Sequence, residues 1–588
     1  MTYATERNKV GRQSFTRFEL DLPTCALTYG IAPCTAALAA GSECRNTNNT
    51  CQDLANYDGS TTKTIEFSDK DISIVGYPMH PLLESAQLSP TKIVKNKALG
   101  KRAQIKLTCR DEGTYSLVDD ADIDPYWATR TYSPQGTFWR KLKAIFKYYN
   151  GSALRVKTTY IADPYDPTDC VTRNYILDDI QGPSKSGKVT LIARDILKLA
   201  DDKRAKWPVA TTGTLAAAMT IGSTASFTIT NGAGQYTDAG AYIRIGDEVI
   251  QYTSGSDSGG NYVIAGTITR SAYGTTAVAH TLGDSVQLCY ELNATNIVDF
   301  LDTLLFTAAG ITSSYKDAGW ATEKADWFTS TNLNGLITKP EGVTKLIEEL
   351  QEHHALFYIW WNEITQKVML KAVAPTPVTT ATLTDSENIL EVIKVTEGSA
   401  DRITRSFVLF GPHNPVNVSE FEDFKTATLK IDADAENSNQ YGDIREAIAL
   451  ARFLTTEGLA LQFGTRKAAR YRDPPKILEV ILDAKDTDLW TGDITNVNTR
   501  YLQDVDGSNK ELLMQVFSVQ ELTTKLPGTQ YKYELVDTVY QGRYGRIMSA
   551  LASSTYGAAS DTEKATGMYI CAAGGANFSD DGGPYQIV

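Results

Sequence analysis

The sequence predicts a multidomain, mainly β fold with α+β parts. The chain has 588 residues, and at roughly 150 residues per domain this implies several separate cores. Hydrophobic residues at 42% and charged residues at 22% are typical of globular proteins, which excludes disorder as the main state. Apolar and polar residues alternate with period two, the pattern of a half-buried strand, over the first two hundred residues and again after about Glu397.

The first two hundred residues are predicted to form a twisted antiparallel sheet or barrel. The alternation is seen in three runs: Phe18, Leu20 and Leu22; Ile72 and Ile74; and Ile105, Leu107 and Cys109. Between Tyr175 and Arg194 two apolar runs flank QGPSKSGK, whose glycine, proline and serine content is typical of a hairpin turn. From about Pro208 to Cys289 the composition shifts to Thr, Ala, Gly and Ser with short strands, which predicts a small, separately folded β-module.

The next segment changes to the helical period. Asn293 or Thr295 is the predicted N-cap of a helix that Gly310 closes. Its apolar face consists of Ile297, Val298, Leu301, Leu304 and Leu305. A second helix has Val343, Leu346, Ile347 and Leu350 on one face, directly before the strand ALFYIWW. We therefore expect a helix followed by a hairpin.

After Glu397 the β pattern returns in ITRSFVLFG, ILEVILDA and LLMQVFSVQEL. Good helix formers with few breakers predict one long helix over 443–462 within this region. The residues from Gly545 onwards are rich in Ala, Gly, Ser and Asp without periodicity. We expect them to lie extended over a neighbouring domain or a partner subunit.

Charge and apolar runs limit the possible classes of function. Lys and Arg number 57 against 70 Asp and Glu, so the net charge is 57 − 70 = −13, a field that repels phosphate backbones. A duplex-binding protein would have the opposite sign. The beginning of the sequence lacks the apolar stretch of a signal peptide, and the longest aromatic-aliphatic run, 355–361, is too short to span a bilayer. We expect a chain that folds in a cytosol without a membrane span.

Four of the eight cysteines fall within 27 residues and form the strongest chemical signal. Cys25, Cys34, Cys44 and Cys51 have the spacing C-x8-C-x9-C-x6-C, in loops rich in Pro, Gly, Thr and Asn. A reducing cytosol disfavours disulfides, and four thiolates are the ligands that zinc or an iron–sulfur cluster requires. The alternative is four free or buried thiols. The spacing does not choose between the metals. The remaining cysteines are Cys109, Cys170, Cys289 and Cys571, to which we assign no chemistry.

Other motifs are explained better by structure than by chemistry. The run 182–189 falls one residue short of a phosphate-binding loop, because Val189 stands where Ser or Thr would hold magnesium and a strand follows instead of a helix. Asp120, Asp122 and Asp124 resemble the start of a calcium loop, but Pro125 stands where the turn requires glycine. A solvated acidic loop is the better interpretation.

No pattern of catalytic residues emerges from the sequence. The five histidines form no zinc motif, and no G-x-S-x-G elbow is present; the histidines are His80, His280, His353, His354 and His413. Glu348 and Glu349 are predicted to lie on the solvated face of a helix. We therefore expect that the chain is not an enzyme.

Several stretches, taken in order, resemble siphophage tail-tip and baseplate-hub proteins. Residues 19–59 are similar to the cysteine-bearing N-terminal part of hubs in phage tails and gene transfer agents. The pairs C-x8-C and C-x6-C also resemble those of the lambda-type tail-tip protein L family, which is associated with a 4Fe-4S cluster. By this resemblance Cys25, Cys34, Cys44 and Cys51 would bind a 4Fe-4S cluster, with Zn²⁺ as the alternative. The middle spacing is shorter than in that family. The other similar stretches are 246–288, 339–373, 401–493 and 543–588.

The resemblance implies six regions along the chain. They are a cysteine-bearing metal region (1–70), a first hub-like β-barrel domain (71–206), an inserted small β-module (207–290), a helix and hairpin segment (291–395), a second hub-like β-barrel domain (396–545) and an extended C-terminal segment (546–588). The implied protein is a homotrimeric hub at the tail tip of a virion, assembled in the host cytoplasm, whose two barrels per subunit give pseudo-sixfold symmetry.

The implied partners are tail-tube proteins, the tape measure protein and receptor-binding or fibre proteins. Genome DNA would pass through without sequence recognition during ejection. A high aromatic content, with 30 Tyr, 18 Phe and 8 Trp, agrees with extensive protein interfaces. The alternatives are a metal-dependent enzyme, either a cell-wall hydrolase or an iron–sulfur redox protein, and a carbohydrate-binding tail component.

Overall fold

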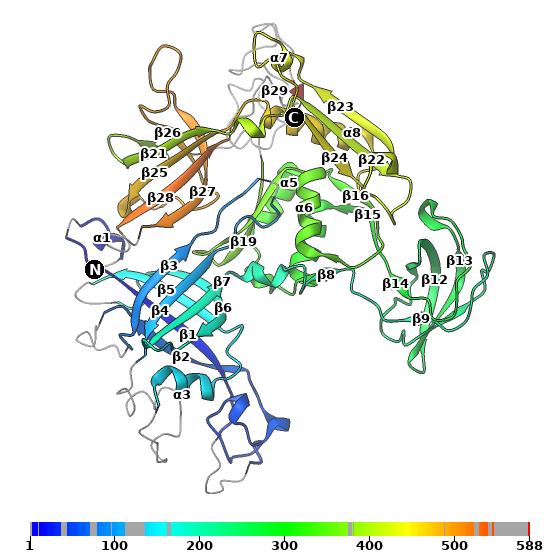
Figure 1. The fold of residues 1–588 in the computed structure, drawn as a ribbon, viewed down its shortest axis with the longest axis horizontal. Coiled ribbons are helices and arrows are strands. Elements are labelled where there is room, and N and C mark those ends of the chain that lie inside the picture. The colour runs from blue at the N-terminus through cyan, green and yellow to red at the C-terminus, as the bar shows by residue number, and fades with distance from the viewer. Residues whose placement is uncertain are drawn as a thin grey trace.

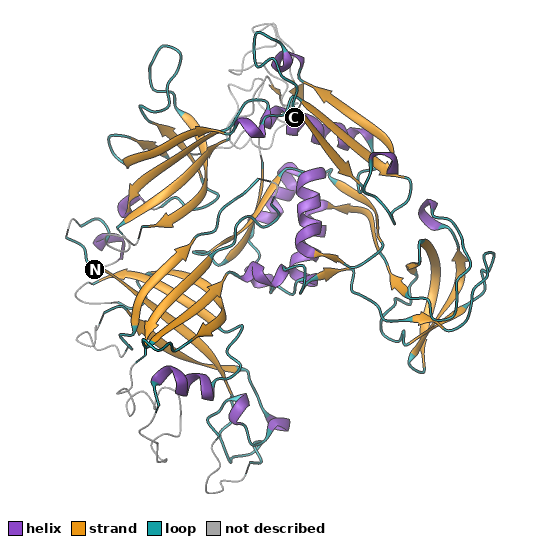
Figure 2. Ribbon diagram, in the orientation of Figure 1, coloured by secondary structure: helices purple, strands orange, loops and turns teal. Residues whose placement is uncertain are grey.

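The computed structural model confirms a mainly β, multidomain fold with barrel-like sheets (Figures 1 and 2). It describes residues 3–9, 11–36, 44–70, 79–95, 97–111, 136–161, 166–373, 379, 381–486, 488–522 and 529–538, with two short strands at 544–545 and 586–587. The predicted strand at Ile72 and Ile74, the acidic run from Asp120 to Asp124, Cys571 and nearly all of 546–588 lie outside the described residues. Within them, no helix is long and apolar enough to cross a membrane.

The first barrel is a seven-stranded sheet in the order β2-β1-β5-β6-β7-β4-β3. Its strands are β1 (Ser14–Thr24), β2 (Thr61–Ser68), β3 (Leu83–Ser89), β4 (Gln104–Arg110), β5 (Ala153–Tyr160), β6 (Val171–Gln181) and β7 (Lys188–Arg194). Because His80, just before β3, bridges Phe67 in β2, the two edges of the sheet approach each other. Phe18, Leu107 and Cys109 point into its core, as their alternation predicts. Helix α3 (Phe138–Ile145) packs against the same core.

The hairpin predicted around QGPSKSGK is confirmed, because 182–187 connect β6 directly to β7. Gly182 (φ 100°) and Gly187 (φ 71°) adopt positive φ, which glycine allows without a steric cost. Val189 is buried in β7, where a phosphate-binding loop would need the N-terminus of a helix.

The predicted small β-module forms its own six-stranded sheet, β14-β11-β12-β13-β10-β9, at the right of Figure 1. Its strands are β9 (Thr214–Leu215), β10 (Phe227–Thr230), β11 (Ala241–Ile245), β12 (Glu248–Ser258), β13 (Asn261–Thr269) and β14 (Val286–Leu288). A separate hydrophobic core, including Ile243, Tyr252 and Tyr262, holds it together. At one end, buried Glu248 binds Arg270 and His280 at 2.6 and 2.9 Å.

The middle segment contains the helices and the hairpin that the sequence predicts. Its elements are β15 (Tyr290–Asn296), α4 (Ile297–Asp302) with a π-helical turn at Thr303–Ala308, α5 (Gly319–Trp327), β16 (Asn332–Ile337), α6 (Val343–His353), β18 (Phe357–Asn362) and β19 (Lys367–Ala372). The N-cap of α4 is Asn296, whose side chain accepts a hydrogen bond from Val298 N. The predicted caps Asn293 and Thr295 are wrong, because β15 continues to Asn296 in its pairing with β16.

One carboxylate of α6, Glu349, was predicted to be solvated, and this prediction is wrong. Glu349 accepts a hydrogen bond from Arg452 Nε at 2.5 Å, and Glu341 lies 3.1 Å from the same guanidinium. The side chains of Arg452 and Glu349 are only 12% and 16% exposed. The helix therefore buries part of its charged face, because α6 packs against β24 (Glu446–Ala451) rather than facing water.

The second barrel-like sheet has the order β20-β26-β27-β28-β25-β21. Its strands are β20 (Thr382–Thr384), β21 (Ile389–Glu397), β25 (Lys476–Asp483), β26 (Ile494–Asn498), β27 (Leu512–Glu521) and β28 (Gln530–Asp537). The edge strands β20 and β21 are joined by the short connection 385–388, so the sheet curves back on itself. Leu478, Val480 and Val516 are among the residues that fill its core.

A separate three-stranded sheet, β23-β22-β24, contradicts the long helix predicted over 443–462. Residues 446–451 form β24, parallel to β22 (Arg405–Pro412), and the helix α8 begins only at Glu457 and runs to Tyr471. Helix-forming residues become a strand here because Ala449 and Ala451 are buried on the side where α8 packs. The third strand is β23 (Phe424–Ile431).

The remaining short elements connect these parts. They are α1 (Tyr3–Glu6), β8 (Lys206–Trp207) paired with β17 (Glu341–Gly342), α7 (Ala433–Glu436), and β29 (Tyr544–Gly545) paired with β30 (Gln586–Ile587).

Buried contacts fix the two barrels to each other. Ile93 N, just after β3, donates to Phe517 O of β27 at 2.9 Å. Arg173 of β6 forms an ion pair with Glu521 of β27 at 2.9 Å, and both side chains are 2% exposed. Glu363, at the β18–β19 turn, accepts a hydrogen bond from Tyr175 Oη at 3.0 Å beside this pair. The three polypeptide regions therefore share one buried polar junction.

A glycine between the second barrel and β18 gives the first testable prediction. Gly492 has φ 97°, and a Cβ atom there would overlap the buried Trp360 ring. We expect Gly492→Ala to lower the melting temperature strongly, since overpacking costs about 1–3 kcal/mol in addition to left-handed strain of about 1–2 kcal/mol. Gly507 is the control, because it has φ 82° but open space around its Cα. Equal decreases in melting temperature for the two alanine variants would show that the Trp360 ring can move aside without cost.

Candidate metal centre

The cysteine loops extend from the open end of the first barrel. Strand β1 ends at Thr24, next to Cys25, and returns through β2, whose first residue Thr61 pairs with Thr24. Cys25 N donates to Asn46 O at 2.6 Å, and Ala26 N donates to Asp58 O at 2.8 Å. The barrel thus fixes both ends of the loop region.

Cys25, Cys34, Cys44 and Cys51 line one small cavity. All four are free thiols, so none is paired in a disulfide. Cys44 is buried and the other three are half-buried. The tertiary fold therefore brings together the residues that the sequence singled out, from loop arms that are up to 26 residues apart.

Backbone amides point at two of the sulfurs. Asn46 N donates to Cys44 Sγ at 3.4 Å, and Asp53 N donates to Cys51 Sγ at 3.3 Å. Both bonds join residue i to the amide of residue i+2, and Asn46 has the left-handed φ of 55° that asparagine tolerates. Such hydrogen bonds favour the thiolate and are typical of the surroundings of metal-bound cysteine.

The electrostatics of the cavity favour neutral thiols as long as no cation is bound. Burial raises the pKa of Cys44 and of Cys51, the amide hydrogen bonds act in the opposite direction, and the neighbouring thiols raise both pKa values further. A positive centre would reverse this balance, because it stabilises all four thiolates together.

Four thiols are suitable donors for a thiophilic metal. Their positions in this structure, however, are not those of ligands around a bound ion. In the described part of the chain, no group of three or more His, Cys, Asp or Glu side chains stands in an arrangement that could hold a metal ion. The fit therefore rests on four thiols around one cavity and on two amide donors to sulfur.

Asp53 ties the loop arms together. Its Oδ2 accepts hydrogen bonds from Thr35 N and Thr35 Oγ1, both at 2.8 Å, and from Asn56 Nδ2 at 2.9 Å. These hydrogen bonds lower the pKa of Asp53. Thr47 Oγ1 donates to Ile145 O of α3 at 3.0 Å, so the loops also contact the barrel.

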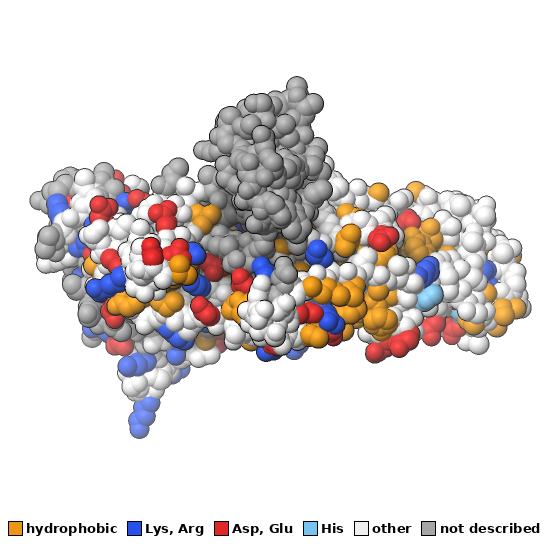
Figure 3. Space-filling model, turned by 90° about the horizontal axis from the view of Figure 1, so that it is seen from above, with side chains coloured by type: hydrophobic (Ala, Val, Ile, Leu, Met, Phe, Trp, Pro, Cys, Tyr) orange, Lys and Arg blue, Asp and Glu red, His pale blue; other side chains and the backbone are white. Residues whose placement is uncertain are grey.

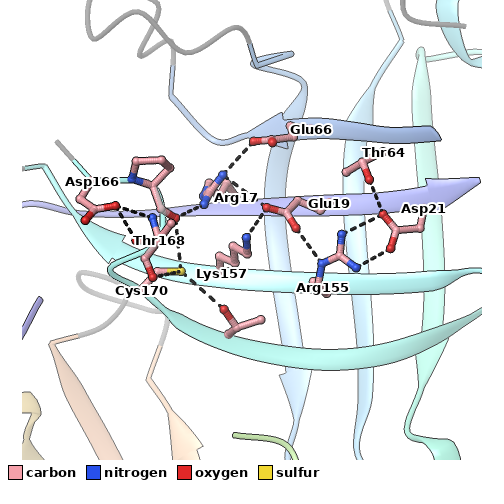
Figure 4. A network of polar contacts seen from close by, with 12 residues as sticks. Arg17, Glu19, Asp21, Thr64, Glu66, Arg155, Lys157, Asp166, Thr168 and Cys170 are labelled. Carbon is pink, nitrogen blue, oxygen red and sulfur yellow. Dashed lines mark hydrogen bonds and ion pairs between the residues drawn. The ribbon is translucent and has the colours of Figure 1, made fainter. Parts of the chain in front are cut away.

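A charge network lies on the face of β1, β2 and β5 that is opposite to the core residues Phe18 and Leu20 (Figure 4). Arg17 binds Glu66 of β2 at 2.8 Å, while Glu19 is bound by Arg155 and Lys157 of β5. Arg155 also binds Asp21. This network was not predicted from the sequence, although the charges at Arg17, Glu19 and Asp21 follow the period of a strand face.

The network predicts an acid-dependent loss of stability. Burial would raise the pKa of Glu19, but hydrogen bonds and charges from Lys157 and Arg155 outweigh it and lower that pKa. A carboxylate with a lowered folded-state pKa stabilises the protein above its unfolded pKa of about 4.3 and loses this effect as pH falls through the folded value. We expect the melting-temperature difference between wild type and Glu19→Gln to be largest above pH 5 and to shrink towards pH 3. A pH-independent difference would contradict this assignment.

The other predicted residues lie apart from the cavity. Cys109 is buried in β4, and burial raises its pKa, as expected for a core residue. Cys289 is also buried. Cys170 is half-buried, with its Sγ 3.7 Å from Pro167 O.

Comparisons with known proteins give structural similarity at low sequence identity. No protein-family model matches the chain, and no curated protein matches its sequence. The 43 kDa tail protein of prophage MuSo2 from Shewanella oneidensis is similar over 78% of this chain and 98% of that chain, with 9% identity and a TM-score of 0.35.

Two further solved structures are similar at the same level. A tail protein from Neisseria meningitidis MC58 covers 77% of this chain and 97% of its own, with 9% identity and a TM-score of 0.37. Prophage tail protein gp18 from Listeria monocytogenes covers 77% of this chain and 87% of its own, with 10% identity and a TM-score of 0.33.

Proposed function

We propose that the chain is a structural protein of a bacteriophage tail tip or baseplate hub, and that it acts by association rather than by turnover. The observation that supports this most directly is the pair of barrel-like sheets held rigidly by the buried Arg173–Glu521 junction. Three such subunits around one axis would present six barrels, which is the symmetry needed to join a threefold hub to a sixfold tail tube.

An exposed apolar sheet face supports a role in assembly. Helix α8 covers one side of the β23-β22-β24 sheet. On the other side Leu429, Phe407 and Ile448 form one row across the three strands. Leu429 is 43% and Ile448 54% exposed, although a solvated sheet face usually presents polar residues. Figure 3 shows further hydrophobic side chains gathered in patches between charged ones on one face of the subunit.

The partners in this proposal are two further copies of the chain, tail-tube proteins, the tape measure protein and receptor-binding or fibre proteins. The site of action is the tail tip of the virion, after assembly in the host cytoplasm. Genome DNA would pass the ring transiently, and the net charge of −13 would oppose its sticking.

Cys25, Cys34, Cys44 and Cys51 would hold a metal centre, either a 4Fe-4S cluster or Zn²⁺. A centre bound by four thiolates supplies structural stabilisation. The amides of Asn46 and Asp53 would orient two of the ligands, and Asp53 would keep the loop arms together.

Mass and shape of the purified full-length chain test the assembly. We expect a trimer by light scattering and ring-shaped particles by electron microscopy, together with incorporation of the chain at the tail tip of assembled particles. A monomer at all concentrations, or tails that assemble and infect normally without this chain, would contradict the proposal.

The colour of anaerobically purified protein tests the metal. A brown protein with a broad visible band indicates iron and sulfur, whereas a colourless protein that releases zinc indicates the alternative. Protein that contains neither metal would show that the quartet consists of free thiols.

A further inference from the structure

A cavity of about 550 Å³ is lined by residues of the small β-module, the β15–β16 ribbon and the β23-β22-β24 sheet. Figure 1 shows where these three parts lie in the fold. This volume is within the range of small-molecule sites, which occur preferentially at domain junctions. The cavity lies outside the cysteine region, and its lining includes neither the four cysteines nor the exposed row Leu429, Phe407 and Ile448. Its chemistry indicates what it binds.

One wall holds an aromatic ring in a fixed and strained position. Tyr273 has φ 55° yet remains 37% exposed. Its Oη donates to Glu291 Oε1 at 2.8 Å, and its ring meets Tyr242 edge-on at 5.0 Å between centroids. Left-handed backbone at a residue other than glycine costs about 1–2 kcal/mol and is concentrated at functional sites. The fold therefore maintains an exposed aromatic surface at the cavity.

The residues on both sides of the tyrosine also adopt left-handed backbone conformations. Ser271 has φ 58° and Gly274 has φ 77°. A Cβ atom at Gly274 would lie 2.5 Å from His413 O, so only glycine allows the turn to approach the β22–β23 connection this closely. The turn closes the cavity between two parts of the chain that are 140 residues apart.

Two asparagine amides on the cavity wall are oriented by the backbone. Asn334 Oδ1 accepts a hydrogen bond from Ala294 N at 2.8 Å, and Asn414 Oδ1 accepts one from Val416 N at 3.0 Å. Each side-chain oxygen thus already accepts a backbone hydrogen bond, and each NH₂ group is left to donate to a ligand. The Glu291 carboxylate adds an acceptor beside the aromatic ring.

The charged groups of the cavity wall are largely neutralised by the protein itself. Arg452 is bound by Glu341 and Glu349, so its guanidinium is not available to bind a phosphate or sulfate bidentately. Lys425 contributes one cation and Glu291 one anion to the lining. This balance favours a neutral ligand over an anionic one.

We propose that this cavity binds a short neutral saccharide. Sugar hydroxyl groups accept hydrogen bonds from amides and donate them to a carboxylate, and the apolar C–H face of a sugar packs on an aromatic ring. Asn334, Asn414, Glu291 and Tyr273 supply these groups together. The site extends the proposed hub function and does not depend on it, because binding is measured on the purified chain.

Saturation-transfer NMR on the purified full-length protein tests the site. The probes are the methyl glycosides of glucose, galactose, rhamnose and N-acetylglucosamine, with maltose and chitobiose. We expect at least one probe to bind, and Asn334→Asp and Asn414→Asp each to weaken its binding about tenfold or more, since each keeps the acceptor but loses the donor. Asn437→Asp is the matched control, because Asn437 accepts from the amide of Asn439 outside the cavity.

Any of three results would overturn the proposal. Absence of binding by every probe would do so, as would binding that both cavity variants leave unchanged. Binding of inorganic phosphate without any glycoside would show that the cavity selects anions through Lys425. Circular dichroism and melting temperature establish that the variants remain folded. A monomeric chain that still binds a glycoside would contradict the hub and leave this site intact.

Discussion

Under the proposed hub function, phage carrying Cys44→Ser or Cys34→Ser is expected to lose infectivity by about a hundredfold or more. The loss of one thiol from the proposed metal centre would remove the metal-binding energy that would order the loops. Cys44 is the most buried of the four thiols and accepts the amide of Asn46, so it has the least freedom to be replaced. The measurements are plaque titre, electron microscopy of tails, and iron and zinc content of the purified chain by mass spectrometry.

Cys170→Ser is the matched control for this prediction. Cys170 is half-buried, as three of the quartet are, but it lies outside the cavity and contacts Pro167 O. We expect normal infectivity and unchanged metal content in this variant. Fully infectious Cys44→Ser phage with normal tails would contradict a required metal centre, and loss of metal without loss of infectivity would limit the centre to a dispensable role.

Arg173→Met is expected to lower the stability of the two-barrel unit by about 3–5 kcal/mol, because it leaves Glu521 buried without a counter-ion. Glu363, 3.9 Å from the same guanidinium, would lose the nearby positive charge as well. Differential scanning calorimetry should show this loss as a lower melting temperature, and limited proteolysis should detect separation of the barrels.

The double variant Arg173→Met/Glu521→Met distinguishes two causes of the lost stability. One is the loss of the attraction between the two side chains, and the other is the burial of Glu521 without a counter-ion. We expect it to recover most of the lost stability, since replacing both members of a buried pair by apolar residues is often neutral. Lys532→Met is the control, because the Lys532–Glu479 pair is partly exposed and worth about 1 kcal/mol or less. If Arg173→Met behaved like this control, the junction would not fix the barrels.

The elements that the sequence predicted correctly depend on short-range patterns. Residues 182–187 form a hairpin turn because two glycines adopt positive φ within a few residues of each other. The face of α6 follows from the helical spacing of Val343, Leu346 and Leu350. In both cases the residues that determine the element are close neighbours in the sequence.

The failed predictions depend on distant partners. Helix formers at 446–451 became β24 because β22, some forty residues earlier, supplies a parallel ladder and α6 packs against the strand. Glu349 was predicted to be solvated, but it forms an ion pair with Arg452, which lies about a hundred residues further along the chain. No local pattern contains either partner.

The sequence by itself determined that this is a multidomain β protein, where its turns and several of its helices lie, and that four cysteines are grouped in one loop region. Only the tertiary structure decided that those thiols line one cavity, that Arg173 and Glu521 join two barrels, and that Tyr273, Asn334 and Asn414 meet at another cavity. The reason is physical: periodicity and turn geometry are set by neighbouring residues, whereas cavities and buried ion pairs form between segments that only the folded chain brings together.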